Sequence, residues 1–583
     1  MFSALWPSEV SVASREPDVT DRAVLPQPSR PAAAIIGALS AAGTRQLFGI
    51  PGGGPNLDVI GAAQQARLRF ALAHGETAAV VMAATYADLT GVPGAVVVTR
   101  GPGLASAVNG IAHAALDRLP VVVIADTVPA PDRDRISHQR LDQDALARPV
   151  AKAVLTLGGH EPDRCAGLAV RLAAARPPGP VVVNVDPRAG HRADTGPEPG
   201  EREPGPASYD LAPLARALRA ARRLAVLLGA DAIAHAGAVR AALAGSNIPV
   251  LHTYRSRGIM PDCSAEAAGL FTGGTMEWPL LSAADVIVGL GVDPVELIPA
   301  AWDYAAITLL VTEYPVGSAG YFTGGTELVA PLPGAIEILA GRARQAGRGW
   351  PAAAGRTAKH AASGRLRRAA TAASAATAAS GSLSPHDVVA TARGVAPPDV
   401  VATVDSGAHM LAVMPLWPVD EPRRLLISSG LATMGFALPA AIGAALARPG
   451  RPVIAFTGDG GLGMTLMEIE TAVRLRLRVV VIVFNDAALS LIKIKQLPEG
   501  QGGDEATGYA RTSFAAVAAA MGAAAACAAS REQLETALTA ALAREGPTVI
   551  DARVDPGGYP AILDLTRGDR GRVRDDRYAT EAG

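Results

Sequence analysis

Two aspartates stand at the ends of two predicted strands in the last third of the chain. Asp459 follows the apolar run Pro452 to Phe456, and Asp486 follows the run Val479 to Phe484, with a helix expected between them at about Thr465 to Leu475. Parallel strands joined by such a crossover helix end at the same edge of a sheet, and neighbouring strands lie about 4.8 Å apart. Both carboxylates could therefore reach one metal ion, and with diphosphate oxygens and water they suit Mg²⁺.

Glycines surround the first aspartate, in the sequence Thr457-Gly458-Asp459-Gly460-Gly461. A Gly-Asp-Gly sequence alone is most often a simple turn after a strand. The second acidic strand end, at Asp486, favours a metal-bridged diphosphate site instead. Backbone N–H groups of the glycines would then approach the phosphates closely.

The elements that must position this site belong to a repeated α/β pattern. Short β-branched runs, glycine-containing turns and Ala/Leu-rich helical stretches alternate through the chain, as in GAVVVTRGPG (94–103), RLAVLLGAD (223–231) and RPVIAFTGDGG (451–461). Continuous apolar strands that alternate with helices predict parallel sheets covered on both faces, whose ligands bind beyond the carboxyl ends of the strands. We therefore predict an α/β protein with three doubly wound parallel-sheet domains.

Changes in composition predict where these domains begin and end. Stretches rich in Pro, Gly, Ser and charged residues separate three blocks of ordinary domain size. Part of the second linker, RLRRAATAASAATAAS, is rich enough in alanine to be helical. The predicted order is a disordered segment at 1–30, a domain at 31–187, a linker at 188–208, a domain at 209–341, a linker at 342–384, a domain at 385–567 and a tail at 568–583.

Composition and charge exclude several classes of function. With 583 residues, 49% of them apolar, the chain is long enough for roughly three to four domains. Its net charge of -1 gives no reason to expect a nucleic-acid or membrane partner. Three widely spaced cysteines (Cys165, Cys263, Cys527) fit a reducing compartment, and we find neither a signal peptide nor a bilayer-spanning run. We expect a cytoplasmic protein that acts on a small molecule.

The Gly-Asp-Gly sequence, followed at this spacing by Asn485-Asp486, resembles the cofactor motif of thiamine diphosphate-dependent enzymes, and in particular of the acetolactate synthase-like (large subunit) group. The resemblance covers about residues 30–565 and is weak only in the middle block. It implies pyrimidine-binding, central and diphosphate-binding domains. It also implies that Asp459, Asp486 and the backbone carbonyl of Ala488 hold Mg²⁺, although most members carry asparagine where this chain has Asp486.

The stretch Ala71-Leu-Ala-His-Gly-Glu76-Thr-Ala-Ala resembles the catalytic glutamate motif of the same family, and the similarity continues through residues 85–125. In the family this carboxyl protonates the aminopyrimidine ring of the cofactor, which implies that Glu76 is catalytic. Taken alone, a glutamate in the first turn of a helix is explained by the helix macrodipole. The dipole would lower the pKa of Glu76, whereas the apolar neighbours would raise it.

Two further segments resemble parts of the family's cofactor site. Ser428 to Pro439 resembles the segment beside the aminopyrimidine, where Met434 would support the bent cofactor and the carbonyl of Ala432 would accept a hydrogen bond from its amine. A methionine is more often core filling than a cofactor support, so Met434 depends on its neighbours for this role. Val404 to His409 matches a diphosphate-contacting turn, which adds the cofactor-binding residues Ser406, Gly407 and His409.

Four positions bear on the substrate. Gly53 stands where some decarboxylases of the family carry an acidic or hydroxyl residue, and the paired histidines of pyruvate decarboxylases are missing, which favours a ligase. Arg100 could bind a substrate carboxylate or be structural. Lys493 and Lys495 could steer an anionic substrate or form a solvated helix face.

The resemblance therefore implies a thiamine diphosphate- and Mg²⁺-dependent carboligase or lyase acting on a 2-oxo acid or a similar carbonyl donor. A non-ligating decarboxylase and a catalytically silent partner subunit are the alternatives, and the presence of Glu76, Asp459 and Met434 speaks against the second. In the family the two halves of the site meet across a subunit interface, which implies at least a homodimer, with a homotetramer as the larger alternative. The central domain of relatives binds FAD, a nucleotide or nothing, and its sequence here does not decide.

Overall fold

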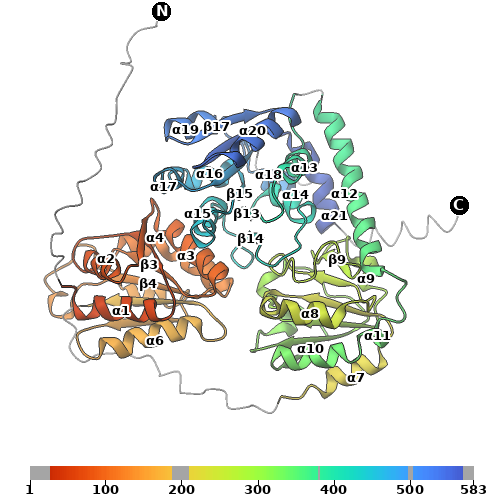
Figure 1. Cartoon of the computed structure of the whole chain (residues 1–583), viewed down its shortest axis with the longest axis horizontal. Coiled ribbons are helices and arrows are strands. Elements are labelled where there is room, and N and C mark those ends of the chain that lie inside the picture. Colours follow the sequence, from red (N-terminus) through yellow and green to blue (C-terminus); the bar gives the residue numbers. More distant parts are fainter. Residues whose placement is uncertain (1–26, 187–208, 379–380, 497–502, 569–583) are drawn as a thin grey trace, which may run out of the picture.

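The computed structural model of the 583-residue chain describes residues 27–186, 209–378, 381–496 and 503–568. Three parallel six-stranded sheets, each flanked by helices, form three lobes that meet in the middle of the molecule (Figure 1). This confirms the predicted α/β fold with three parallel-sheet domains. The predicted linker at 188–208 lies outside the described residues, as do the predicted disordered N-terminus, up to residue 26, and the tail from residue 569 onwards.

The first and third domains share one strand order. The order is β2-β1-β3-β4-β6-β5 in the first domain and β14-β13-β15-β16-β18-β17 in the third. When the strands of each domain are numbered from its own first strand, both orders read 2-1-3-4-6-5. The central sheet has the order β12-β11-β10-β7-β8-β9, the doubly wound arrangement whose strand order reverses between β7 and β10. Ligands of such sheets bind at that reversal.

The first domain has the strands β1 Gln46–Ile50, β2 Arg69–Leu72, β3 Gly94–Val98, β4 Val121–Asp126, β5 Ala153–Leu157 and β6 Pro180–Val185, and the helices α1 Arg30–Ala41, α2 Pro55–Gln65, α3 Glu76–Thr90, α4 Pro102–Leu116, α5 Gln143–Ala147 and α6 Pro162–Ala174. All residues of β3 and β4 are buried, as expected for apolar strands covered on both faces.

The central domain has the strands β7 Leu224–Leu228, β8 Val250–His252, β9 Ala267–Leu270, β10 Val286–Leu290, β11 Ile307–Thr312 and β12 Thr326–Val329, and the helices α7 Ala212–Ala220, α8 Ala236–Leu243, α9 Trp278–Leu281, α10 Leu332–Ala340 and α11 Ala343–Ala346. Helix α12, Ala354–Ala378, then runs from this domain to the third (Figure 1). It occupies most of the segment that we predicted to be a linker, because alanine and arginine favour a helix over a random coil.

The third domain has the strands β13 Val401–Val404, β14 Leu425–Ile427, β15 Val453–Gly458, β16 Val479–Asn485, β17 Ala524–Ala528 and β18 Thr548–Arg553, and the helices α13 Pro385–Val395, α14 Ala408–Leu416, α15 Ala437–Ala447, α16 Asp459–Thr465, α17 Glu468–Arg474, α18 Ser490–Gln496, α19 Phe514–Ala520, α20 Arg531–Ala543 and α21 Tyr559–Arg567. The single helix predicted at about Thr465 to Leu475 is wrong in detail: two short helices, α16 and α17, form the crossover, and the first begins at Asp459 itself.

Helices α3 and α15 join the first and third domains into one hydrophobic core. Both are apolar on nearly every face, and α15 approaches α3 so closely that a Cβ on Gly443 would collide with the backbone of Met82. The position that carries Glu76 is therefore anchored on the third domain of its own chain. Among the described residues, no helix combines the length and the hydropathy that a membrane span requires.

Candidate functional site

The two predicted metal ligands lie side by side. Strands β15 and β16 pair in parallel up to Gly458 and Phe484, so Asp459 and Asp486 follow the same ends of neighbouring strands, as predicted. The Asp459 carboxylate accepts hydrogen bonds from the backbone N–H of Gly460 at 2.7 Å and of Ala487 at 2.6 Å. Its orientation is thus fixed by the backbone of both strand ends.

Among the residues that the structure describes, no cation balances the charges of these two carboxylates. Ser490 Oγ donates to Asp486 Oδ2 at 2.6 Å, but no ion pair of the described residues involves either aspartate. Burial raises the pKa of Asp459, and burial together with the charge of Asp459 raises the pKa of Asp486 to about 7. Two adjacent carboxylates, buried at Asp459 and partly buried at Asp486, fit a divalent metal ion when the described residues supply no cation.

A cavity of about 220 Å³ opens at these strand ends. Four segments line most of it: the turn between β13 and α14, the segment between β14 and α15, the end of β15 and the end of β16. The structure brings together in it all the residues that the sequence predicted to bind the cofactor or the metal, namely Ser406, Gly407, His409, Ala432, Met434, Gly458, Asp459, Gly460, Gly461, Asp486 and Ala488.

Ala432 and Ala487 have backbone conformations that alanine rarely adopts. Their φ angles are 51° and 61°, in the left-handed region where a Cβ is sterically unfavourable. Ala432 lies in the segment before α15, and Ala487 directly precedes the predicted metal ligand Ala488. Strained residues held by their surroundings are frequent at ligand sites.

Asp405, at the end of β13, holds these loops together and was not predicted as a site residue. It is 1% exposed and accepts hydrogen bonds from the backbone N–H groups of Ser406, Gly435 and Phe436 at 3.0, 3.1 and 3.1 Å, and from Thr457 Oγ1 at 3.0 Å. Burial raises its pKa to about 6, against the opposing effect of these hydrogen bonds. The sequence did contain a signal for this residue, because an aspartate that stands between an apolar strand and a Ser-Gly turn is placed at the carboxyl end of the sheet.

Tyr509 is a second residue that sequence reasoning missed. Its hydroxyl donates to Asp459 Oδ1 at 2.6 Å, and its backbone N–H donates to the carbonyl of Ala487 at 3.1 Å. The N–H of Leu489 in turn donates to Thr507 at 2.7 Å, so the chain around Tyr509 runs along the metal-ligand turn as a short antiparallel bridge. Nothing in its local sequence marks this tyrosine, because the contact forms only on folding.

Glu76 lies at the first helical position of α3, with Gly75 as N-cap. Burial raises the pKa of its carboxyl, which outweighs the lowering effect of a backbone hydrogen bond. A Cβ on Gly103, near the start of α4, would lie 3.4 Å from Glu76 Oε1. Neither Glu76 nor any other described residue of the first domain lines the cavity at Asp459.

The four substrate candidates also lie outside that cavity. Gly53 is exposed, with open space where a side chain would be. The Arg100 backbone N–H donates to Asp126 at 2.8 Å, and its guanidinium lies 3.5 Å from the same carboxylate. Lys493 pairs with Asp504 at 2.8 Å, and Lys495 is exposed. Their roles at the substrate stay predictions.

Comparisons with known proteins agree with this geometry. The N-terminal TPP binding domain of thiamine pyrophosphate enzymes matches residues 30–146, and the C-terminal TPP binding domain matches residues 405–552. The acetolactate synthase of Bacillus subtilis (strain 168) is 30% identical over 550 residues, which is 90% of this chain and 93% of that protein. The catabolic acetolactate synthase of Raoultella terrigena is 30% identical over 554 residues, or 91% and 96% of the two chains. The chain belongs to the acetolactate synthase-like family of thiamine diphosphate-dependent enzymes. This confirms the predicted family.

A solved structure shares the fold of this acetolactate synthase-like enzyme. The thiamine diphosphate-dependent 4-hydroxybenzoylformate decarboxylase of Rhodococcus jostii RHA1 superposes with a TM-score of 0.73 at 21% sequence identity, over 90% of this chain and 99% of that one.

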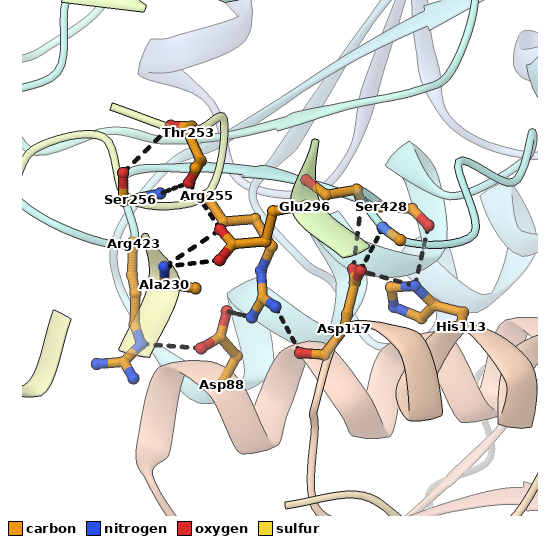
Figure 2. A network of polar contacts seen from close by, with 12 residues as sticks. Asp88, His113, Asp117, Ala230, Thr253, Arg255, Ser256, Glu296, Arg423 and Ser428 are labelled. Carbon is orange, nitrogen blue, oxygen red and sulfur yellow. Dashed lines mark hydrogen bonds and ion pairs between the residues drawn. The ribbon is translucent and has the colours of Figure 1, made fainter. Parts of the chain in front are cut away.

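The central domain of the enzyme meets the other two domains in a polar network (Figure 2). The guanidinium of Arg255 donates to the carbonyl of Asp117 at the end of α4 and lies 3.8 Å from Asp88 on α3. Arg423 of the third domain donates to the same Asp88 at 2.9 Å. The side chains around Arg255 therefore join all three domains.

Glu296 occupies the strand-order reversal of the central sheet. Both of its carboxylate oxygens accept from the backbone N–H of Ala230, after β7, at 3.0 and 3.1 Å, and Thr253 Oγ1 donates to it at 2.6 Å (Figure 2). The loops after β7 and β10 are in contact, since a Cβ on Gly229 would collide with the carbonyl of Gly291. A protein carboxylate thus already fills the place where a nucleotide phosphate would sit.

A cavity of about 300 Å³ lies beside this network, between the first and central domains. Four guanidiniums line it, and each is paired with a carboxylate of the protein: Arg118 with Asp293, Arg176 with Glu313, and both Arg255 and Arg423 with Asp88. Each guanidinium at this end of the central sheet therefore already has a carboxylate partner within the protein.

Proposed function

We propose that this enzyme is a thiamine diphosphate- and Mg²⁺-dependent carboligase that acts on a 2-oxo acid, as an acetolactate synthase does. The observation that carries the proposal is the cavity in which every predicted cofactor- and metal-binding residue meets beside two carboxylates without a cation. Its similarity to the named acetolactate synthases over 90% or more of the chain supports ligation rather than simple decarboxylation. Gly53, which has no side chain to donate a proton, agrees with ligation.

Each part of the cavity has a role in this proposal. Asp459, Asp486 and the carbonyl of Ala488 would hold Mg²⁺, and backbone N–H groups from Gly458 to Gly461 would face the diphosphate. Met434 would support the cofactor between its two rings, and the carbonyl of Ala432 would accept a hydrogen bond from its amine. Thiamine diphosphate held in this way would supply the nucleophilic and electron-accepting chemistry that a reaction at a substrate carbonyl needs.

Glu76 would hold and transfer the proton at the aminopyrimidine ring. Burial raises the pKa of its carboxyl, which is the direction that suits a general acid. Because no described residue of the first domain lines the cavity of the same chain, we propose that Glu76 enters the cavity of a second copy, in a homodimer or a larger assembly. Large apolar side chains are exposed in both domains that would contribute to the shared site: Leu57 and Leu72 in the first domain, and Met464 and Met467 in the third. Such side chains could be covered in the proposed dimer.

Product analysis tests the reaction. The purified protein is incubated with pyruvate, thiamine diphosphate and Mg²⁺, and the products are identified by mass spectrometry. Acetolactate supports the carboligase, whereas acetaldehyde alone would make the enzyme a decarboxylase. A protein that binds the cofactor but makes no product from any 2-oxo acid would fit a silent partner subunit.

Mixing two inactive variants tests the shared site. Glu76→Gln and Asp459→Ala each remove one half, so a mixed dimer contains one intact site only if the halves come from different subunits. We expect activity in the mixture that neither variant has alone. Activity that stays absent after subunit exchange, with mixed dimers shown by mass, would contradict the shared site.

We further propose that the central domain holds no FAD or nucleotide, because Glu296 and the paired arginines leave no place for phosphates. Flavin fluorescence in the supernatant of denatured protein should be absent, and calorimetric titration with FAD or ADP should show no binding. Saturable binding of either ligand would refute this part.

A further inference from the structure

A buried carboxylate of the third domain reaches the chain directly before Glu76. Glu468, the first residue of α17, is 2% exposed. Its Oε1 accepts hydrogen bonds from the backbone N–H groups of His74 and Gly75, both at 3.0 Å, and its Oε2 accepts one from Thr471 Oγ1 at 2.7 Å. Glu468 therefore binds the two amides that immediately precede the helix on which Glu76 stands.

Helix α17 contacts the same segment from its exposed side. Glu470 Oε2 lies 2.7 Å from His74 Nε2, and Arg474 donates to the carbonyl of Leu72 at 2.6 Å. The side chains of His74 and Glu470 are 34% and 36% exposed. Exposed pairs of this kind are weak, whereas the hydrogen bonds to Glu468 are shielded from water.

We infer that Glu468 is a positioning residue for the reaction, which fixes the start of α3 and thereby the direction of the Glu76 carboxyl. A general acid works only within hydrogen-bond reach of the atom it protonates, so the backbone that carries it must be held to a fraction of an ångström. This inference rests on the proposed role of Glu76.

The position of Glu468 in the chain adds a consequence for the dimer. Helix α16 begins at the metal ligand Asp459, and α17, which begins at Glu468, follows it directly. If the Glu76 of one chain serves the cavity of its partner, Glu468 connects the metal end of one cavity to the acid of the other. The two sites of a dimer would then be coupled through each chain.

Four variants separate positioning from simple stability. Glu468→Met keeps the length but leaves two amides without an acceptor, and Glu468→Asp keeps the charge but withdraws it by one methylene group. Glu468→Gln keeps an oxygen acceptor in place and is the conservative rescue. Glu470→Gln is the matched control, because it removes the carboxylate charge that faces His74 of the same segment from the same helix.

Hydrogen exchange of the protein without cofactor is the first measurement. The peptide spanning residues 72–80 should exchange faster in Glu468→Met than in wild type, while Glu468→Gln and Glu470→Gln should resemble wild type. The second measurement, on the holoenzyme, is the exchange rate of the thiazolium C2 proton. We expect it to slow about 10²-fold in Glu468→Met and about tenfold in Glu468→Asp, the size expected for small misplacements of a catalytic group. The affinity for thiamine diphosphate and the KM should change less than about twofold.

The outcomes distinguish this inference from the proposed function. Wild-type C2 exchange in both Glu468→Asp and Glu468→Met, beside slow exchange in Glu76→Gln, would overturn the inference alone. If Glu470→Gln slowed C2 exchange as much as the Glu468 variants do, the inference would also be overturned. Any weakening of the contacts between α17 and the segment before Glu76 would then be enough to slow C2 exchange. If Glu468→Met does not fold, Glu468→Asp still decides. A wild-type protein that binds no thiamine diphosphate would overturn the proposed function and this inference with it.

Discussion

The carboxyl ends of the central and third sheets both carry buried carboxylates, yet the two regions are built in opposite ways. At the central sheet, Glu296 accepts hydrogen bonds from Ala230 and Thr253 and lies near the partly buried guanidinium of Arg255. At the third sheet, Asp459 and Asp486 face each other beside an open cavity without a cation from the described part of the chain. The comparison indicates that the structural junction is distinguished from the binding site by hydrogen-bond donors and a guanidinium close to its carboxylate, although burial raises the pKa to about 7 at both Glu296 and Asp486.

The physical reason is the cost of a buried charge. A carboxylate removed from water must regain its interactions from nearby donors and cations, otherwise it raises the free energy of the folded state. At the junction, Ala230, Thr253 and Arg255 supply part of these interactions, so removing the Glu296 side chain should destabilise the fold. At the third sheet, a metal ion must be added to supply these interactions to Asp459 and Asp486. Binding of the metal ion and cofactor should therefore stabilise the fold.

The largest expected effect concerns the incomplete site. Asp459→Ala should weaken thiamine diphosphate binding in the presence of Mg²⁺ by at least about 10²-fold. Residues that only hydrogen-bond a metal ligand already contribute about 10- to 100-fold to metal affinity, and Asp459 is proposed as a direct ligand. Isothermal titration calorimetry measures this. Asp486→Asn is the control and should still bind, since its amide supplies an oxygen ligand. Unchanged affinity in Asp459→Ala would remove Asp459 from the metal site.

The junction should respond in stability and not in cofactor affinity. Glu296→Ala leaves the N–H of Ala230 and the hydroxyl of Thr253 without their acceptor and should lower the free energy of unfolding by about 3 kcal/mol. Denaturant titration at pH 6 measures the loss, and calorimetry on the folded variant should give the wild-type thiamine diphosphate affinity. If Glu296→Ala had wild-type stability but bound the cofactor poorly, the junction would serve binding and not stability, which would contradict the comparison.

A pH series sharpens the same point. Burial raises the pKa of Glu296 to about 7, against the lowering effect of Arg255, Thr253 and Ala230, whereas an unfolded glutamate titrates near about 4.3. The folded state therefore binds this proton more tightly, and the resulting stability is present below about pH 4 and is lost as the pH rises through 7. Between pH 5 and 8, the stability of Glu296→Gln relative to wild type should improve on the order of 1–3 kcal/mol. A constant difference would show that Glu296 does not titrate in this range.

The smallest expected effect is at the edge of the metal site. Tyr509→Phe removes one of the donors that orient Asp459 and leaves those of Gly460 and Ala487. We expect Mg²⁺ affinity, measured in the presence of thiamine diphosphate, to fall a few-fold, about 1 kcal/mol. Tighter binding would mean that the hydroxyl competes with the metal ion.

Local sequence was sufficient where a site residue stands at the end of a strand. Asp459 and Asp486 were predictable because apolar runs marked β15 and β16, and a crossover places both strand ends at one edge. Local sequence could not predict the roles of three other residues, namely Glu468, Glu296 and Tyr509. Their contacts join segments that are far apart in the chain and leave no local pattern. Helix α12 shows a different limit, since its alanine-rich composition fits both a linker and a helix.

The core shared by α3 and α15 also bears on how the protein is made. Helix α3 is buried on nearly all sides only when α15 covers it, and about 350 residues of synthesis separate the two. At about 5–20 residues per second, the ribosome takes roughly 20 to 70 s to supply that cover. During this interval the nascent first domain exposes an apolar helix to solvent or to a chaperone, and the segment that bears Glu76 reaches its final place only when the last third of the chain has emerged.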